Sequence, residues 1–331
     1  MRVSARAANL PRMIDRRSLL ALAAAGVPAS ALAAIPSYAD DPAEVLPLWP
    51  GLPPGAPATL PDEQYIERAR PGEPHDRYAA QIARPTISVF RPQNPTGNAV
   101  LLAPGGAYIR VVTDKEGYDS ARWLTAHGIT AFVLRYRLPG GGWAHASDVP
   151  LQDAQRAIRL IRSRARDFSI DPERLGVIGF SAGGHVAASL AVHHATAVYD
   201  PVDAADSLSA RPQVVGLLYP VISMGAYAHG GSRDALLGKA PGNAAIMAYS
   251  PDRHVTADTP PTLLVHAADD PAVPLENSLN MFAALRAASV PSELHVFEAG
   301  GHGFGLRLAP GATAWAWPDL FLGFARRHGF A

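Results

Sequence analysis

The stretch Leu175-Gly-Val-Ile-Gly-Phe-Ser-Ala-Gly-Gly-His185 decides how this chain folds and where its chemistry lies. A short apolar run is followed by a glycine, Ser181, two more glycines and an alanine-rich segment of helical character. Gly179-Phe-Ser-Ala-Gly183 fits the pattern G-x-S-x-G, which needs a strand before it and a helix after it. The turn is so sharp that the serine is strained, and flanking glycines avoid collisions with neighbouring elements. The pattern predicts a nucleophilic serine, with a glycine-rich turn around a buried serine as the alternative.

Apolar runs typical of buried strands recur on both sides of this turn, with helical patterns between them. The predicted strands cover residues 86–90, 99–103, 129–134, 175–180, 214–219, 262–267 and 293–297. The predicted helices cover residues 118–127, 151–165, 181–194, 275–288 and 314–328. Alternating strands and helices with right-handed crossovers indicate an α/β fold, a doubly wound and mostly parallel sheet flanked by helices. No long insertion suggests a separate lid domain.

The composition narrows the possible functions. The chain has 331 residues, of which 48% are hydrophobic, and its formal net charge is zero. This describes a globular protein with one large core and argues against a nucleic-acid partner or a polybasic membrane partner. The sequence contains no cysteine, so a disulfide framework, a thiolate nucleophile and a cysteine-ligated metal are all excluded.

The first 84 residues differ in composition from the rest. Arg16-Arg17 precedes a short, weakly apolar stretch, which predicts a twin-arginine export signal over 1–39 with cleavage after Ala33 or Ala39. A surface amphipathic helix and an uncleaved membrane anchor are the alternatives, and we expect no stable membrane span after cleavage. Residues 40–74 hold nine prolines, so 40–84 should be an extended segment packed on the surface, pinned by Trp49. Residues 85–331 then form the catalytic domain.

Two residues after later strands could complete a site around Ser181. A serine is a weak nucleophile without an oriented base, and in the α/β-hydrolase order an acid and then a histidine follow the serine, each after a strand. Asp270 follows the strand predicted at 262–267, and His302 follows the last predicted strand in a glycine-flanked loop. We favour Asp270 as the acid because a proline-rich turn follows it directly, and Asp269 is the alternative.

The other histidines fit structural roles better. A satisfied structural histidine is the expected reading for His127, His266 and His295. His185 lies within one helical turn of the serine, where it could contact the site but would crowd Ser181 rather than act as its base. The spacing of His193-His194 supports no metal site.

Backbone donors for a developing oxyanion are expected at two turns. The N–H of Ala182 lies at the start of the helix that follows the serine. Pro104-Gly-Gly-Ala-Tyr108 follows an early strand, where the fold has its second donor, so the N–H groups of Gly106 and Ala107 are candidates. An ordinary glycine turn is the alternative, but the two turns, the acid and the histidine all occur in the required order.

In these residues the chain resembles the bacterial α/β-hydrolases known as acetyl xylan esterases or carbohydrate esterases, which are related to the hormone-sensitive-lipase-like esterases. The resemblance covers most of residues 48–305. The matching stretches are Leu48-Trp-Pro-Gly51, Ala103-Pro-Gly-Gly-Ala-Tyr108, Glu116-Gly117, Asp153-Ala-Gln-Arg-Ala157, Gly179-Phe-Ser-Ala-Gly-Gly-His185, Tyr219-Pro-Val-Ile222, Ser250-Pro251, Pro260-Pro261 through Asp270, and Gly300-Gly-His-Gly-Phe304. Ala107 stands where the family usually has a glycine.

The resemblance implies hydrolysis of small acyl esters, most often acetyl esters, on carbohydrates such as acetylated xylan or its oligosaccharides. Ser181 would attack the carbonyl, His302 would take its proton, and Asp270 would orient the imidazole. It implies no cofactor. The expected partner is a small-molecule or oligosaccharide ester, and the oligomeric state stays open. A short-chain carboxylesterase with a non-carbohydrate substrate is the alternative. A prolyl-oligopeptidase-type peptidase or a non-catalytic binding member fits less well, because the chain has no room for a gating domain and retains both serine and histidine.

The paired arginines also predict where the protein acts, namely the periplasm or the exterior. Replacing Arg16 and Arg17 with Lys should leave the precursor in the cytoplasm, because the export receptor recognises the arginine pair. Fractionation of cells that express both forms measures this. Export of the Lys-Lys variant at the wild-type level would contradict the prediction.

Overall fold

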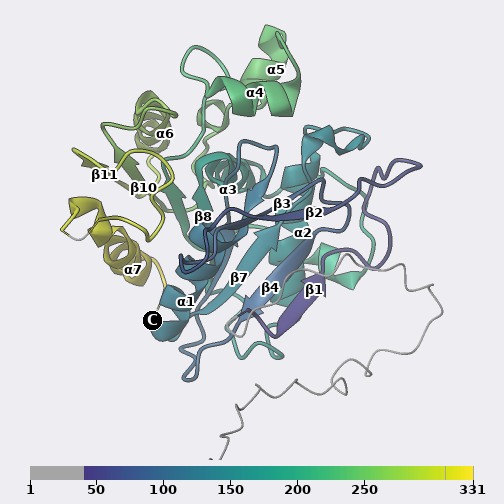
Figure 1. Ribbon diagram of the computed structural model, residues 1–331, viewed down its shortest axis with the longest axis horizontal. Helices are drawn as coiled ribbons and strands as arrows, with labels where there is room; N and C mark the ends of the chain where they lie inside the picture. Colours follow the sequence, from purple (N-terminus) through teal and green to yellow (C-terminus); the bar gives the residue numbers. More distant parts are fainter. Residues whose placement is uncertain (1–40, 310, 331) are drawn as a thin grey trace, which may run out of the picture. The chain divides into compact units, whose positions relative to one another are not determined.

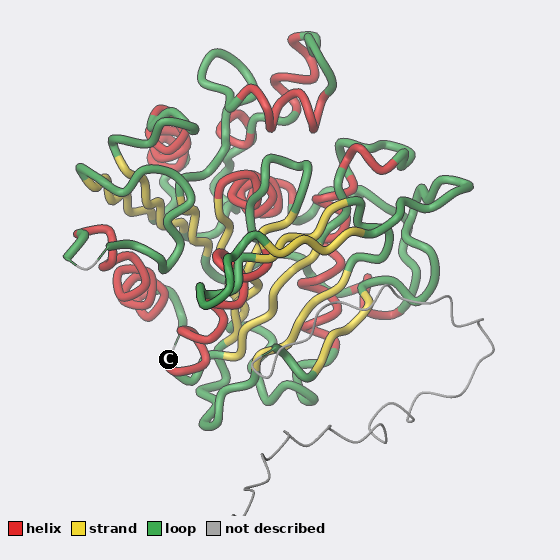
Figure 2. The backbone as a smooth tube through the Cα atoms, viewed as in Figure 1, coloured by secondary structure: helices red, strands yellow, loops and turns green. Residues whose placement is uncertain are grey.

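Two β-sheets organise residues 41–309 and 311–330, which are the parts of the chain that the computed structural model describes (Figure 1, Figure 2). The predicted export signal at 1–39 lies outside them. The larger sheet has eight strands, which lie in the order β1 (Glu44–Pro47), β4 (Thr86–Phe90), β7 (Thr130–Arg135), β5 (Ala99–Ala103), β8 (Leu175–Phe180), β9 (Val215–Leu218), β10 (Thr262–Ala267) and β11 (Ser292–Phe297). The six strands from β7 to β11 are parallel, and β4 and β1 add two antiparallel strands at one edge.

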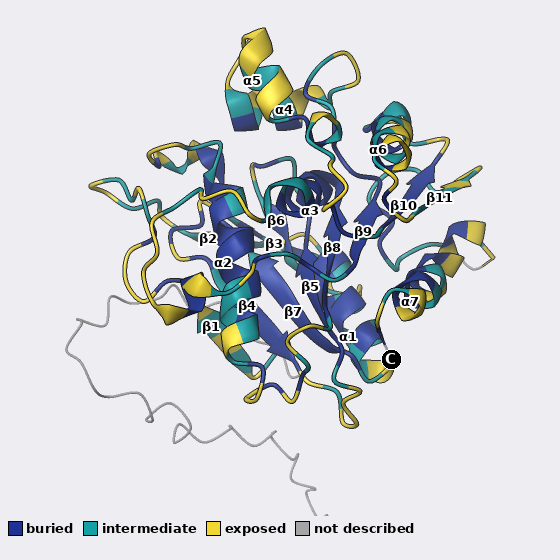
Figure 3. Cartoon of the chain, turned by 180° about the vertical axis from the view of Figure 1, so that it is seen from behind, coloured by how far each residue is buried: buried dark blue, intermediate teal, exposed yellow. Residues whose placement is uncertain are grey.

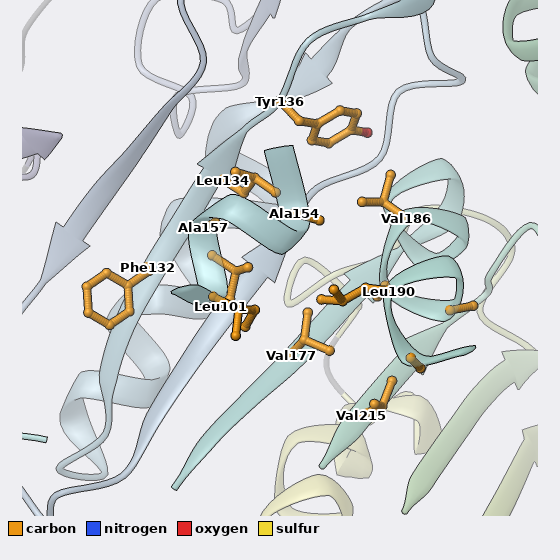
Figure 4. Close-up of a cluster of buried hydrophobic side chains, with 14 of the residues drawn as sticks. Leu101, Phe132, Leu134, Tyr136, Ala154, Ala157, Val177, Val186, Leu190 and Val215 are labelled. Carbon is orange, nitrogen blue, oxygen red and sulfur yellow. The ribbon is translucent and has the colours of Figure 1, made fainter. Parts of the chain in front are cut away.

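The predicted strands of this sheet are confirmed to within one or two residues at their ends. The side chains of β5, β8, β9 and β10 alternate between two buried faces, as continuous apolar runs in a covered sheet require. Figure 4 shows Leu101 and Val177 pointing into one layer of the core, where they meet Val186 and Leu190 of a covering helix. Val100 belongs to the cluster on the opposite face.

Helices cover both faces of the sheet. They are α1 (Asp119–Ala126), α2 (Val149–Ser163), α3 (Ser181–His193), α4 (Gly230–Leu237), α5 (Asn243–Ala248), α6 (Glu276–Ala287) and α7 (Trp317–Arg327). α2, α3 and α6 contribute to one core cluster, and α1 and α7 to the other. The predicted doubly wound α/β fold is therefore confirmed. None of the helices in the described ranges has both the length and the apolar character that crossing a bilayer requires.

Residues 41–84 are integrated into the fold rather than laid over it. The sequence separated 40–84 from the domain, but β1 joins the main sheet, and all described residues fall in one compact unit. β2 (Gln64–Glu67) and β3 (Arg77–Ala80) form the smaller antiparallel sheet with β6 (Val111–Val112). β1 and β2 are edge strands, the position that a proline-rich segment tolerates because a proline cannot donate to a ladder, whereas β3 is the middle strand of the smaller sheet.

Trp49 anchors this segment by more than apolar contact. Its indole is buried, and Nε1 donates to Oδ1 of Asp153 at 2.8 Å. Asp153 also pairs with Arg137 at 2.9 Å, and neither side chain of this pair is exposed. Removing one member would leave a buried charge without its partner, so the pair ties residues 41–84 firmly to α2.

The connection from β9 to β10 departs from the sequence expectation. No helix was predicted between residues 219 and 262, yet α4 and α5 both lie there. Figure 3 shows their largely exposed surfaces, and α5 buries no residue fully. Such short helices with weak amphipathic patterns give little sequence signal. His229 at the start of α4 brings this connection to the pocket that contains Ser181.

Candidate active site

Ser181 stands at the turn from β8 to α3 in a strained conformation. Its φ is +52°, in the left-handed region that non-glycine residues rarely occupy. A Cβ at Gly183 would lie 2.0 Å from the carbonyl oxygen of Ala103, and one at Gly179 would lie 2.3 Å from the carbonyl oxygen of Gly183. Both distances are far inside van der Waals contact, so only glycine fits. These contacts confirm the steric reason that the sequence pattern suggested.

The structure brings Ser181, His302 and Asp270 together in one hydrogen-bonded line. His302 Nε2 lies 2.8 Å from Ser181 Oγ, and His302 Nδ1 lies 2.7 Å from Asp270 Oδ2. A carboxylate only accepts, so Nδ1–H donates to Asp270, and Nε2 is left to accept the serine O–H. The imidazole therefore presents the nitrogen that can take the serine proton.

Asp270 is held as an anion by several donors. Its side chain is 1% exposed, and Oδ1 accepts from the N–H groups of Ala272 and Val273 at 2.8 and 2.9 Å. Burial opposes ionisation, but hydrogen bonds from His266, His302 and the Val273 N–H outweigh it and hold the pKa of Asp270 well below its usual range. His266, expected to be structural, thus supports the acid.

Asp269 has a different task from its neighbour. Its exposed carboxylate points away from the imidazole, and Oδ1 accepts from the N–H groups of Gly300 and Gly301 at 2.9 and 2.8 Å. Asp269 therefore anchors the loop that contains His302. Of the two acids that the sequence left open, the histidine contacts Asp270.

The loop of Gly106 and Ala107 faces the serine with unpaired N–H groups. Neither N–H donates to any atom in the described ranges, whereas the Gly106 carbonyl accepts from the N–H groups of Ile109 and Arg110. Ala107 has a φ of +56° and Tyr108 a φ of +61°. Left-handed conformations at two successive non-glycine residues cost free energy, so other contacts must hold this turn.

Tyr108 and His185 supply that support. The Tyr108 hydroxyl lies 2.6 Å from His185 Nδ1, and His185 Nε2 lies 2.7 Å from the Tyr249 carbonyl oxygen. A carbonyl only accepts, so Nε2 carries the proton and Nδ1 accepts from the tyrosine. Burial lowers the pKa of His185 to about 4, which keeps the imidazole neutral. The histidine contacts the oxyanion loop rather than the serine hydroxyl.

Glu116 and Tyr219 connect the oxyanion loop to the histidine loop. Glu116 lies in a π-helical turn, Thr113–Tyr118, of the kind that often occurs at functional sites. Its Oε2 accepts from the Gly105 N–H at 2.7 Å, and its Oε1 accepts from the Tyr219 hydroxyl at 3.1 Å. That hydroxyl in turn accepts from the Gly305 N–H at 3.0 Å.

Neither residue of this link was predicted to have a role of its own. Burial raises the pKa of Glu116, while its hydrogen bonds and the nearby imidazole of His302 favour the ionised form. The Tyr219 ring packs edge-on against His302, with ring centroids 5.0 Å apart. Glu116-Gly117 and Tyr219-Pro220 occurred only as parts of the resemblance, because no local pattern shows that residues 103 positions apart share a hydrogen bond.

A pocket of about 250 Å³ opens onto these groups. Ser181, His302, Gly106 and Ala107 line it together with Glu116, His229 and three basic residues, Arg68, Arg110 and Lys115. A larger hollow of about 530 Å³ is lined by Ile109 of the oxyanion turn together with Pro61, Gly140 and Asp234. In the described ranges no three histidine or acidic side chains gather in a way that could hold a metal ion.

A profile of the BD-FAE family matches residues 87–285, which is more than half of the chain. The chain belongs to the BD-FAE family. The matched range contains Ser181 and Asp270, and His302 follows it.

Relatives agree with this assignment. The chain is 34% identical over 221 residues to an acetylxylan esterase of Xylanibacter ruminicola, and 37% identical over 206 residues to endo-1,4-beta-xylanase B of Butyrivibrio fibrisolvens. These matches cover 65% and 62% of this chain but only 43% and 32% of the relatives, so the chain spans less than half of their length.

A solved structure matches over nearly its whole length. It is an acetyl ester-xyloside bifunctional hydrolase from Caldicellulosiruptor lactoaceticus, 35% identical, with a TM-score of 0.70; the match covers 89% of this chain and 99% of that one. The comparisons confirm the resemblance to acetyl xylan esterases and the α/β-hydrolase fold. The names of two of these proteins, an acetylxylan esterase and an acetyl ester-xyloside hydrolase, describe ester hydrolysis.

The depressed pKa of His185 predicts a pH dependence of stability. Between pH 6.5 and about 4, His185 is protonated in the unfolded chain but stays neutral in the folded protein. Acidification over this range therefore favours unfolding. The free energy of unfolding should fall by about 3 kcal/mol over this window because of His185 alone.

Urea unfolding at several pH values tests this dependence. His185→Gln should be less stable near neutrality yet lose about 3 kcal/mol less than the wild type on acidification. His127→Gln, which changes an exposed histidine, should keep the wild-type dependence. An equal loss in the wild type and in His185→Gln would contradict the assignment.

Proposed function

We propose that this protein is a serine esterase that removes small acyl groups, most often acetyl, from carbohydrates such as acetylated xylan or its oligosaccharides. The observation that carries the proposal is the line from Ser181 Oγ through His302 to Asp270, beside backbone N–H groups with no partner of their own. A nucleophile, an oriented base and oxyanion donors are what acyl transfer requires.

The reaction would proceed in two halves. Ser181 Oγ attacks the ester carbonyl while His302 Nε2 takes its proton, and the N–H groups of Gly106, Ala107 and Ala182 stabilise the oxyanion. His302 then protonates the leaving alcohol, and an acyl group remains on the serine. Water repeats the sequence and releases the acid. Asp270 stabilises the imidazolium that forms in each half, and its depressed pKa keeps it ionised for this task.

The lining of the pocket supports a small acyl group. Aliphatic side chains contribute only Ala107, Val112 and Ala272 to it, and the rest of the lining is largely polar or charged. Each buried methylene contributes roughly 0.8 kcal/mol of binding where apolar surface is available. A long acyl chain would find little such surface here.

The carbohydrate part of the proposal rests on two observations. The hydrolase from Caldicellulosiruptor lactoaceticus, which resembles this chain over almost its full length, is named for an acetyl ester and a xyloside. The hollow of about 530 Å³ beside the oxyanion loop offers room for an alcohol much larger than methanol or ethanol.

The two neighbouring acids provide a matched test of the mechanism. Asp270→Asn should lower kcat for 4-nitrophenyl acetate by about three to four orders of magnitude, because the imidazole loses its orienting anion. Asp269→Asn should lower it far less, because an amide oxygen can still accept from the two glycine N–H groups. Circular dichroism verifies that both variants are folded. Effects in the reverse order would overturn the assignment of the acid.

Acyl size tests the substrate class. The value of kcat/KM for 4-nitrophenyl esters should be highest for acetate and fall from butyrate to octanoate, since a chain that finds no pocket gains no transition-state binding. Acetate release from acetylated xylan and from acetylated monosaccharides should be measured beside it. A kcat/KM that rises steadily toward octanoate would instead indicate a lipid-directed carboxylesterase.

A further inference from the structure

The pocket around the serine carries an excess of positive charge that the proposed chemistry does not use. Arg68, Arg110 and Lys115 line it, and Glu116 is the only carboxylate among its lining residues. Ester hydrolysis needs backbone donors at the oxyanion, which Gly106, Ala107 and Ala182 can provide. Three cationic side chains beside them therefore call for another explanation.

Arg110 belongs to the same turn as the oxyanion donors. Its N–H donates to the Gly106 carbonyl, and a Cβ at Gly106 would lie 2.2 Å from the Arg110 carbonyl oxygen, so the two residues are in tight contact. Arg110 and Ser181 line the same pocket, so a group that Arg110 binds there shares the pocket with the nucleophile. Val112 continues from this turn into β6 and lines the same pocket.

The guanidinium of Arg110 lacks an anionic partner. No carboxylate in residues 41–309 or 311–330 pairs with it, and its Nε is buried without a hydrogen-bond acceptor. It lies over the ring of Tyr78 at 5.3 Å, and Arg68 lies over the same ring at 5.4 Å. Arg68 is neutralised by Asp76 at 2.8 Å. Tyr78 thus contacts two guanidinium groups. That of Arg68 has an anionic partner, and that of Arg110 has none among the described residues.

Lys115 adds a second uncompensated cation. Its ammonium forms no ion pair with any residue that the structure describes. The carboxylate of the adjacent Glu116 already accepts from the Gly105 N–H and the Tyr219 hydroxyl. Bringing like charges together at one pocket costs free energy unless an anion joins them. A planar carboxylate suits a guanidinium fork with an ammonium beside it.

We propose that Arg110 and Lys115 bind a carboxylate on the alcohol part of the substrate, so that the preferred substrate is an acyl ester on an acidic carbohydrate such as one containing a uronic acid. This inference rests on the proposed esterase function and narrows its substrate class. The carboxylate is assigned to the alcohol part because the acetyl group of the proposed substrate carries no charge.

A pair of acetyl esters that differ only in charge tests the proposal. 4-Acetoxybenzoate carries a carboxylate on its alcohol part, and methyl 4-acetoxybenzoate is its neutral counterpart. The readout is the ratio of kcat/KM for the anionic ester to kcat/KM for the neutral ester. Each of Arg110→Gln and Lys115→Gln should lower this ratio by about tenfold, as expected for the loss of a charge-assisted hydrogen bond. In the wild type, 0.5 M NaCl should lower the ratio as well.

Controls separate the possible outcomes. Arg166→Gln removes a charge from an exposed residue beyond the end of α2, and it should leave the ratio unchanged. The ratio for 4-nitrophenyl hemisuccinate against 4-nitrophenyl butyrate tests the acyl side, and a large effect of Arg110→Gln there would move the carboxylate to the acyl part and overturn the proposal.

Two further results are decisive. The inference would be overturned if neither variant changed the ratio, including the case in which kcat/KM falls equally for the anionic and the neutral ester. The esterase function would still stand. No hydrolysis of any of these esters by the wild type would contradict the esterase function itself. If Arg110→Gln does not fold, Lys115→Gln and the salt dependence of the wild type still decide the matter.

Discussion

The close approach of α3 to the end of β5 is the constraint on which the site depends. A Cβ at Gly183 would lie 2.0 Å from the carbonyl oxygen of Ala103. The helix can begin at Ser181 because residue 183 is a glycine and has no side chain. The same approach brings the first N–H groups of α3 beside the loop that follows β5. A strained serine and the loop of Gly106 and Ala107 are therefore two results of a single packing contact.

Buried polar links then hold the loops around the serine in register. Glu116 joins the Gly105 N–H to the Tyr219 hydroxyl, which accepts from the Gly305 N–H next to the histidine loop. His185 supports the other end of the oxyanion turn through Tyr108. These links stabilise left-handed backbone at residues that are not glycine, and they explain how a turn with Ala107 instead of glycine can keep its N–H groups directed at the pocket.

The sequence was informative wherever one short segment contains the whole signal. The strand, glycines and helix around Ser181 lie within eleven residues, and apolar runs marked the parallel strands because both faces of the sheet are covered. Ser181, Asp270 and His302 could be predicted as a set because each of them lies in the turn or loop after a predicted strand. Asp269 and Asp270 stayed open because adjacent residues on a loop differ only in direction, which tertiary hydrogen bonds decide.

What the sequence missed depends on contacts between distant segments. β1 pairs with β4 across about forty residues of proline-rich chain, and the alternation in four residues is too short to predict a strand. α4 and α5 bury little and so carry little apolar periodicity. The roles of Glu116 and Arg110 become visible only when the smaller sheet and the π-helical turn bring them to the pocket of Ser181.

The most direct test of the central claim is to identify the residue that reacts with a fluorophosphonate. Peptide mass spectrometry after brief labelling of the folded protein should find one adduct, on Ser181, because its Oγ lies 2.8 Å from a histidine that Asp270 orients and has oxyanion donors beside it. Labelling of His302→Ala under the same conditions should be almost absent. An adduct on another serine, or equal labelling of Ser181 with and without His302, would contradict the account.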